Sequence, residues 1–301
     1  MKKRNILVLG LFFLVLSLTV IGCGDKAPTQ ETLAGEQKLA IRLATDYRQG
    51  SIGYQQLENF AQTLQEKSEN TIVVKVYAAN EWSKAEEFAE YVKLGSLEMA
   101  CLKLDNAEQL QTAYALYKQP YLFSSLQAVE SYILGTEGRK ALDTLPQDFY
   151  GVCFVPDGYL YLLDNGQVQW ESYGVVKHLG ETKALENTKI YDLRAVYSIQ
   201  PLVTTRSWWD TLTEEQQSWI QESFSEAAAA SFAGQRENDP TQTLLSSGVI
   251  FEDNTAPAWS SYSSMYQNQR EAYFSEHSDS LTAYWRPVVI PPAITGEEAV
   301  S

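Results

Sequence analysis

Short apolar runs alternate with helical patterns over the first part of the chain. Leu39–Ala44 is a compact apolar run, Thr71–Tyr77 is rich in β-branched residues, and Leu97–Leu102 is again apolar. Each of these runs predicts a strand. Two helical patterns separate them, so the order is strand, helix, strand, helix, strand. This order predicts an α/β fold with a parallel sheet and helices on both of its faces.

The two helices between these strands have clear apolar faces. The first helix places five apolar side chains at helical spacing, namely Tyr54, Leu57, Phe60, Ala61 and Leu64. In the second helix, Ser83 and Glu86 have the spacing of a capping box, and an end near Gly95 is expected. Its inward side chains are Phe88, Tyr91 and Val92.

The remaining pattern predicts further elements and no internal repeat. In chain order we expect helices over Ala107–Tyr117 and Ser125–Leu145, an extended Tyr150–Leu163, a strand Pro201–Thr205, a long helix from Thr213 to at least Arg236, a strand Val249–Phe251 and a helix Tyr262–Phe274. Thr213 and Gln216 form a second capping-box pattern.

The N-terminal segment has the layout of a secretory signal. Basic residues at positions 2–4 precede the apolar run Ile6–Ile21, which is too short for a comfortable membrane span. The tetrapeptide Val20–Cys23 resembles the bacterial lipobox. We therefore expect residues 1–22 to be a lipoprotein signal peptide and Cys23 to carry the lipid that holds the protein at a membrane outside the cytoplasm. A plain secreted protein and a single N-terminal anchor helix are the alternatives.

Three further boundaries follow from composition. Residues 23–38 are polar, contain Pro28 and have no apolar period, so a flexible tether is expected. Residues 39–286 hold the ordered pattern and form the predicted domain. Residues 287–301 begin at Pro287 and contain two more prolines, so an irregular tail is expected.

Charge and motif content exclude several classes of function. The signal peptide holds three of the 23 basic residues and none of the 38 acidic ones, which leaves a formal net charge of −18. Such a chain repels phosphate backbones, so nucleic acid is not an expected partner. His178 and His277 are far apart, and neither a phosphate-binding glycine loop nor a nucleophile elbow is present. We therefore expect no metal site, no cofactor and no enzymatic activity.

Two cysteines remain besides Cys23. Cys101 and Cys153 both lie in apolar, strand-like runs. An oxidising compartment would permit a disulfide between them, but two buried free thiols are the expectation.

Several blocks of sequence together resemble the substrate-binding proteins of TRAP (tripartite ATP-independent periplasmic) transporters. They follow the family's order at sensible spacings and cover about two-thirds of the chain. The blocks are Phe60–Ser68 with Val73–Tyr77, Tyr91–Ala100, Gln119–Phe123, and Pro201–Val203 with Trp209–Gln216 and Leu244–Val249. The resemblance implies a two-lobed, periplasmic-binding-protein-like architecture with mixed sheets, in which the long helix from Thr213 spans the hinge. It also implies a small-molecule ligand and a membrane permease as partners.

The chain departs from the family at its carboxylate clamp. Members usually carry an arginine in a Gly-x-Lys-x-Arg-Val strand of the second lobe, whose planar fork pairs with a ligand carboxylate. The closest string here, Asn187–Tyr191, places Tyr191 at that position. A second placement aligns Gly174–Val176 with a family turn and removes the arginine strand altogether. The family's second usual arginine corresponds to a position near Leu160. Both placements predict a shortened second lobe without the clamp.

Two functions remain open at this point. The protein is either a solute receptor for a TRAP-type permease or a degenerate lipoprotein that serves as a binding or scaffold partner of a membrane protein or sensor. For a receptor, Arg194 is the first candidate to meet a ligand carboxylate, and a neutral, aromatic or cationic ligand is the other option. The further candidates lie near predicted strand ends, where open α/β sheets bind ligands: Arg48, Tyr47, Asn80, Glu81, Lys103, Asp105, Tyr159, Tyr161, Arg206 and Trp208.

Overall fold

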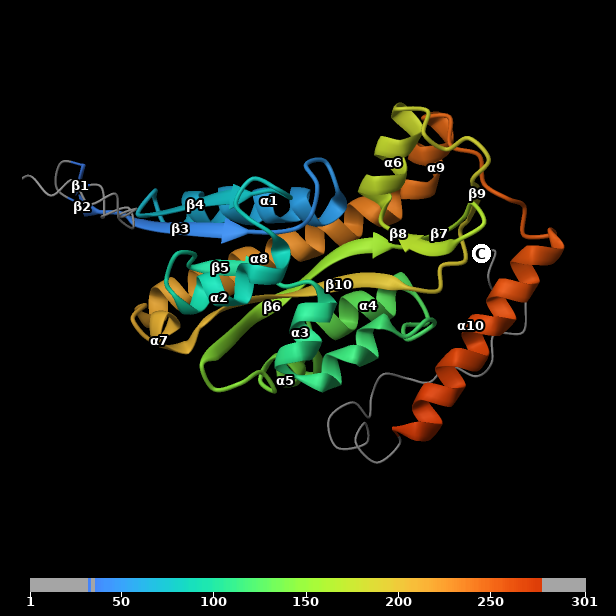
Figure 1. The fold of residues 1–301 in the computed structure, drawn as a ribbon. Helices are drawn as coiled ribbons and strands as arrows, with labels where there is room; N and C mark the ends of the chain where they lie inside the picture. Colours follow the sequence, from blue (N-terminus) through green and yellow to red (C-terminus); the bar gives the residue numbers. More distant parts are fainter. Residues whose placement is uncertain (1–31, 34–35, 278–301) are drawn as a thin grey trace, which may run out of the picture.

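The structure is a computed structural model that describes residues 32–33 and 36–277 (Figure 1). The predicted signal peptide, the lipid-attachment residue Cys23 and the tail 287–301 lie outside the described residues, as does most of the tether. Two short strands of that region, β1 (Thr32–Leu33) and β2 (Glu36–Gln37), pair with each other in antiparallel fashion.

The first lobe is built on a five-stranded sheet with the order β4-β3-β5-β10-β6. Its strands are β3 (Leu39–Ala44), β4 (Ile72–Tyr77), β5 (Met99–Cys101), β6 (Phe149–Tyr159) and β10 (Tyr197–Thr205). β3 is parallel to both β4 and β5, which confirms the parallel core predicted from the sequence. β10 is antiparallel to both β5 and β6, so the sheet is mixed, as the family resemblance implied.

Helices cover both faces of this sheet and enclose two apolar cores. The core on one face packs side chains of α1 (Ile52–Lys67), α7 (Arg206–Trp209) and α8 (Glu214–Glu237) against the sheet. The core on the other face is formed by α2 (Phe88–Lys93), α3 (Leu104–Leu110), the 3-10 helix η2 (Thr112–Lys118), α4 (Leu126–Ile133) and α5 (Thr136–Leu142). The arrangement of helices on both faces is therefore confirmed.

The second lobe holds a separate three-stranded antiparallel sheet, β8-β7-β9. Its strands are β7 (Tyr161–Asp164), β8 (Val168–Glu171) and β9 (Lys189–Tyr191), and α6 (Tyr173–Glu181) and α9 (Pro240–Ser246) accompany them. α6 and α9 lie side by side at one end of the molecule, and Val176 and Leu244 from these helices share a core with Ile190 of β9 (Figure 1).

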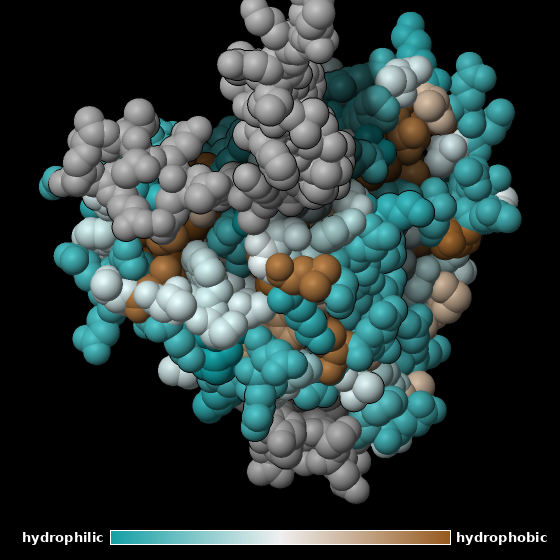
Figure 2. All heavy atoms as spheres, turned by 60° about the vertical axis from the view of Figure 1, so that its left-hand side comes forward, coloured by the Kyte–Doolittle hydropathy of each residue, from teal (hydrophilic) through white to brown (hydrophobic). Residues whose placement is uncertain are grey.

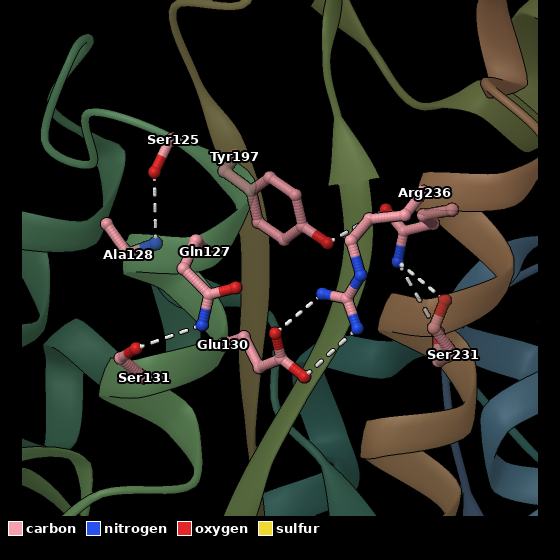
Figure 3. A network of polar contacts seen from close by, with 9 residues as sticks. Ser125, Gln127, Ala128, Glu130, Ser131, Tyr197, Ser231 and Arg236 are labelled. Carbon is pink, nitrogen blue, oxygen red and sulfur yellow. Dashed lines mark hydrogen bonds and ion pairs between the residues drawn. The ribbon is translucent and has the colours of Figure 1, made fainter.

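Strands β6 and β10 and helix α8 run from the first lobe toward the second (Figure 1). The capping box at Thr213 and Gln216 is confirmed, with both hydrogen bonds present at the start of α8. Near the other end of α8, Arg236 donates to Glu130 of α4 at 2.6 Å, and the Tyr197 hydroxyl of β10 donates to Gln235 at 3.0 Å (Figure 3). These contacts fix the end of the long helix to α4 and to β10, one of the strands that run toward the second lobe.

α10 (Pro257–Glu276) joins the two lobes from the side (Figure 1). Tyr266 belongs to the core of Leu162 and Tyr191 in the second lobe, whereas Tyr273 and Phe274 pack against the core of the first lobe. No helix in the described part of the chain is both long and apolar enough to cross a membrane.

Some predicted elements were wrong in detail. Ser83 donates to Glu87 and does not cap a helix, because the chain turns first through the 3-10 helix η1 (Ala85–Glu87). Gly135 divides the stretch predicted as one helix into α4 and α5. The stretch predicted as a helix over Ala107–Tyr117 is likewise divided, between α3 and η2. Val249–Phe251 is not a strand, although the neighbouring Glu252 N–H donates to the Ile190 carbonyl at 2.8 Å.

Candidate functional site

A polar pocket of about 370 Å³ lies between the two lobes. The first lobe contributes the loop after β3 and the loop after β4, and the second lobe contributes α6. Its lining residues are Arg48, Gln49, Gly50, Ala78, Ala79, Asn80, Glu81, Gly174, Lys177, His178 and Glu181. Because both loops leave the carboxyl ends of parallel strands, the pocket lies where open α/β sheets bind ligands.

The two loops of the first lobe hold each other in place. Glu81 accepts hydrogen bonds from the Gln49 side chain at 2.7 Å and from the Ala78 N–H at 2.8 Å. Gly50 and Asn80 have positive φ angles of 81° and 67°, a conformation that glycine and asparagine adopt most readily. Glu81 therefore has a structural role in shaping the wall of the pocket.

One face of α6 forms the opposite wall. Gly174, Lys177, His178 and Glu181 follow the i, i+3, i+4, i+7 spacing of a single helix face. A Cβ atom added at Gly174 would lie 3.0 Å from the Ser51 Cβ, so α6 closely approaches the loop of the first lobe. Within residues 36–277, the side chains of Arg48, Lys177 and His178 have no hydrogen-bond or ion-pair partner. The charge of Arg48 acts on the nearby Glu171 carboxyl, whose pKa burial raises and Arg48 lowers. The pocket therefore contains basic groups that no hydrogen bond or close ion pair within the described residues holds in place.

A second cluster of polar side chains lies at the same edge of the sheet, on the side of α3. Asp46 follows β3, Lys103 follows β5, and Gln200 lies on β10. Lys103 Nζ is 3.7 Å from Asp46 Oδ2 and 3.6 Å from Glu86 Oε1. Burial raises the pKa of the Asp46 carboxyl, although Gln200 and Lys103 lower it.

Asp157 on β6 is buried beneath this edge. Its carboxylate accepts a hydrogen bond from the Gly53 N–H in the first turn of α1 at 2.7 Å. Burial raises the pKa of Asp157 to about 7. Tyr47 is also buried, and its hydroxyl donates to the Val155 carbonyl at 3.0 Å. Tyr47 therefore supports the floor below Arg48 and is not among the residues that line the pocket.

Arg194 is bound to carboxylates of the protein itself. Its guanidinium donates to Asp239 at 2.5 Å and lies 3.6 Å from Asp192, over the ring of Tyr159. Burial raises the pKa of Tyr159 to about 12, while Arg194 lowers it. The Tyr161 hydroxyl is 3.2 Å from Thr241, which in turn donates to Asp192.

The positions expected for the family's arginines are apolar. Tyr191 lies on β9, is completely buried and contacts Tyr262 of α10 edge to face at 5.2 Å between ring centroids. Leu160 packs against the same core. Neither position can provide a guanidinium to a ligand. Gly174–Val176, the alternative alignment with a family turn, is helical in α6.

Three other predicted residues lie outside the pocket. Asp105 forms an ion pair with Lys118 on the surface of the first lobe. Trp208 and Arg206 belong to α7, which follows the end of β10 at the sheet edge opposite to the pocket (Figure 1). Arg206 lies there over the ring of Tyr150.

Sequence reasoning missed the contribution of α6. The signal was present, because Lys177, His178 and Glu181 form a polar stripe at helical spacing on the same face as Gly174. One of the two alignments with the family placed Gly174–Val176 in a turn, and the other made no use of this stretch. Among the described residues, no group of three or more His, Cys, Asp and Glu side chains is arranged to hold a metal ion.

Comparisons with known proteins agree with this architecture. Residues 43–168 match the model of the family described as bacterial extracellular solute-binding protein, family 7. No curated protein matches the chain. A TRAP periplasmic solute-binding protein from Ochrobactrum anthropi superposes with a TM-score of 0.65 at 18% identity, over 83% of this chain and 96% of that one.

Two further solved structures were determined with ligands. The TRAP periplasmic solute-binding protein from Desulfovibrio desulfuricans, with bound sn-glycerol-3-phosphate, gives a TM-score of 0.67 at 14% identity over 81% of this chain and 98% of that one. The TRAP periplasmic solute-binding protein from Shewanella oneidensis, with bound succinate, gives a TM-score of 0.62 at 14% identity, over 80% of this chain and 95% of that one. At these identities the likeness concerns the fold, and together with the family match it confirms the resemblance predicted from the sequence.

Proposed function

Since the chain has the fold of TRAP periplasmic solute-binding proteins and matches the family 7 model over residues 43–168, we propose that it captures a small molecule between its lobes and presents it to a TRAP-type membrane transporter. Lobes of this kind close on a ligand by a hinge, and the closed form is the one that docks on the permease. Family 7 is a family of solute-binding proteins, and the proposal includes no catalytic step.

The observation that carries this proposal is the pocket shared by the two lobes. Its volume of about 370 Å³ lies within the range of small-molecule sites. Arg48, Asn80 and Glu81 come from the first lobe, whereas Lys177, His178 and Glu181 come from the second. A ligand that touches both sets of residues would hold the lobes together, which is the coupling that a transport receptor needs.

The ligand differs from that of a receptor with the usual clamp. Tyr191 and Leu160 cannot bind a carboxylate, and Arg194 already faces Asp192 and Asp239. We therefore propose that any ligand carboxylate meets Arg48 or Lys177. Tyr159 and Lys103 remain candidate contacts at the edge of the cleft.

The proposed location is the outer side of a bacterial cell membrane. The lipobox-like Val20–Cys23 supports a lipid anchor at Cys23, followed by the polar stretch 24–38 as the tether. Mass spectrometry of the protein produced in a bacterial host tests the anchor. A diacylglyceryl modification that is lost in Cys23→Ser supports it, and an unmodified secreted chain contradicts it.

A thermal-shift screen of the chain from Gly24 tests solute capture. Organic acids, amino acids, sugars, aromatic compounds and polyamines provide the range of chemistry. A ligand at about one hundred times its dissociation constant adds about 2.7 kcal/mol to the free energy of unfolding, which raises Tm by a few degrees. A shift that Arg48→Met reduces supports the proposed site. No shift across the library would contradict solute capture.

That negative result would favour the alternative of a scaffold lipoprotein. The surface shown in Figure 2 gives this alternative little support, because that face is mainly hydrophilic and its hydrophobic side chains form small separate groups. Interaction surfaces between proteins usually have a larger apolar centre.

A further inference from the structure

Two buried oxygen atoms at the carboxyl edge of the first-lobe sheet lack a donor. Asp46 Oδ1 and Gln200 Oε1 are both inaccessible to solvent and have no hydrogen-bond partner among the described residues. Gln200 as a whole is 8% exposed. Leaving such an acceptor buried and unpaired costs about 1–3 kcal/mol, and more for a charged group. The two residues are neighbours, because the Gln200 side chain lowers the pKa of the Asp46 carboxyl that burial raises, and they lie at an edge where ligands bind.

No nearby side chain among the described residues donates a hydrogen bond to these two oxygen atoms. Lys103 Nζ forms ion pairs with the other oxygen of Asp46 at 3.7 Å and with Glu86 Oε1 at 3.6 Å, and both distances exceed that of a hydrogen bond. Its side chain is 39% exposed, so it can move toward solvent. Asp46, Glu86 and Lys103 together have a net charge of −1. Burial raises the pKa of the nearby Asp157 carboxyl, and the negative charge of Asp46 raises it further. The group therefore attracts a cation.

Resting on the proposed function, we infer that Asp46 and Gln200 form a subsite for a protonated amino group of the transported solute. An ammonium group has three donors and no acceptor, so it can serve Asp46 Oδ1 and Gln200 Oε1 at once. Its positive charge matches the excess negative charge of the cluster.

The second lobe is consistent with an amine-containing solute. On one of the two alignments with the family, Tyr191 stands at the position of the clamp arginine, and Asp192 and Asp239 form ion pairs with Arg194. The unpaired Arg48 and Lys177 in the pocket remain available for an anionic group elsewhere on the same solute. The inference concerns the amino group alone, so both a diamine and an amino acid satisfy it.

Probes that share a carbon skeleton separate the contribution of the amino group to binding from that of the rest of the ligand. For each of several carbon skeletons, the diamine, the amino acid and the diacid of equal length are titrated into the chain from Gly24 by calorimetry. We expect the diamine or the amino acid to bind and the diacid of the same skeleton to bind at least tenfold more weakly, which corresponds to about 1.4 kcal/mol.

Variants then locate the amino group. Asp46→Asn keeps the shape of the side chain and removes its charge, and we expect it to weaken amine binding about tenfold or more. Gln200→Met removes the second acceptor and should act in the same direction. Asp105→Asn is the matched control, because it removes a surface carboxylate of α3 that pairs with Lys118. Circular dichroism verifies that each variant is folded.

Lys103→Met distinguishes this subsite from a simple ion pair. If Asp46 serves only to bind Lys103, this variant gains no affinity for amines. If Lys103 competes with the ligand, amine affinity rises severalfold. A diacid that binds as tightly as its matched amine, with affinity unchanged in Asp46→Asn, overturns the inference and leaves solute capture intact. Absence of binding by every probe and by the wider library overturns both.

Discussion

The guanidinium of Arg194 donates to the carboxylate of Asp239 at 2.5 Å. Asp239 thus forms with Arg194 the kind of ion pair that a ligand carboxylate would form, and Asp192 adds a second negative charge at 3.6 Å. The side chain of Arg194 is half exposed, yet its charge is already balanced inside the protein. A carboxylate ligand would have to displace one of these partners, which makes Arg194 a structural residue in this account.

Replacing Arg194 tests this role. Arg194→Ala should leave solute affinity within roughly twofold of the wild type and lower the free energy of unfolding by about 1 kcal/mol, the scale of partly exposed ion pairs. Denaturant unfolding and calorimetry measure the two effects. Arg236→Ala is the control, since Arg236 forms a comparable exposed pair with Glu130. Loss of solute binding in Arg194→Ala alone would restore Arg194 as a ligand clamp.

The close approach of α6 to the first lobe predicts a second effect. Gly174→Val adds atoms where even a Cβ would lie 3.0 Å from Ser51, so the α6 face should move away from the Arg48 loop. We expect solute affinity to fall about tenfold or more. Titration calorimetry measures the loss.

Gly234 provides the matched control on α8. An added Cβ there meets nothing within 4 Å, and glycine in a helix interior costs about 0.5–1 kcal/mol relative to alanine. Gly234→Ala should therefore raise the free energy of unfolding by that amount without changing solute affinity. Normal affinity in Gly174→Val would show that the contact between α6 and Ser51 is not needed for binding.

Asp157 predicts how stability depends on pH. Burial raises its pKa from 3.8 to about 7 in the folded protein, so between these values the folded state holds a proton that the unfolded state has released. The contribution of this group to the free energy of unfolding therefore decreases as pH rises through this interval. Burial raises the pKa of Asp46 as well, so Asp46 adds a decrease of the same sign.

The neutral variant Asp157→Asn isolates that contribution. Its side-chain oxygen can still accept from the Gly53 N–H, but the variant carries no charge at any pH. Relative to the wild type, Asp157→Asn should gain stability progressively from pH 3.8 to about pH 7, by an amount on the order of a few kcal/mol. Denaturant unfolding at a series of pH values measures the difference. A difference that does not vary with pH would mean that Asp157 stays ionised in the fold.

The prediction of two free thiols is confirmed, and the sheet explains why. Leu202 of β10 pairs with Cys101 on one side and with Cys153 on the other. A whole strand therefore separates the two cysteines, and two strand spacings amount to about 9–10 Å, too far for a disulfide. The expectation of full burial holds for Cys101, whereas Cys153 is partly exposed.

Oxidation of the chain from Gly24 provides the test for the thiols. Burial raises the pKa of both groups, which disfavours the reactive thiolate. With oxidised glutathione under native conditions, mass spectrometry should show no intramolecular disulfide, and Cys101 should react with a thiol reagent only after unfolding. An intramolecular disulfide formed without denaturant would contradict the strand order.

Much of the first lobe could be predicted from local pattern. β3, α1 and β4 follow directly from the apolar spacing of residues 39–77, and the capping box fixes the start of α8. At Ser83 the same kind of pattern failed, because the Ser83 hydroxyl donates to Glu87 and its oxygen does not accept from a backbone N–H of a helix. A capping motif in the sequence thus does not determine whether its hydroxyl caps the helix or bonds to another side chain.

The candidate site was harder to predict, because it depends on tertiary partners. Arg194 has the correct chemistry for a clamp, but the chain brings Asp239 beside it from 45 residues further on. Trp208 follows a strand, but that strand is antiparallel to β5, so it leads to the wrong edge of the sheet. Arg48, Asn80 and Glu81 follow parallel strands, and these predicted residues do line the pocket. Tyr47 and Lys103 also follow parallel strands but do not line the pocket, so strand direction gives the edge of the sheet and not the side chains that face the pocket.

The most direct test of solute capture is the affinity of a screening hit for the Lys177→Met variant. Lys177 belongs to the second lobe, lines the pocket and has no ion-pair partner within the described residues, so only ligand binding should be affected. Lys189→Met on the same lobe is the control, since Lys189 is exposed and lies outside the pocket. We predict at least about tenfold weaker binding in Lys177→Met and unchanged binding in Lys189→Met. Equal affinity in wild type, Lys177→Met and Arg48→Met would contradict capture of the solute between the two lobes.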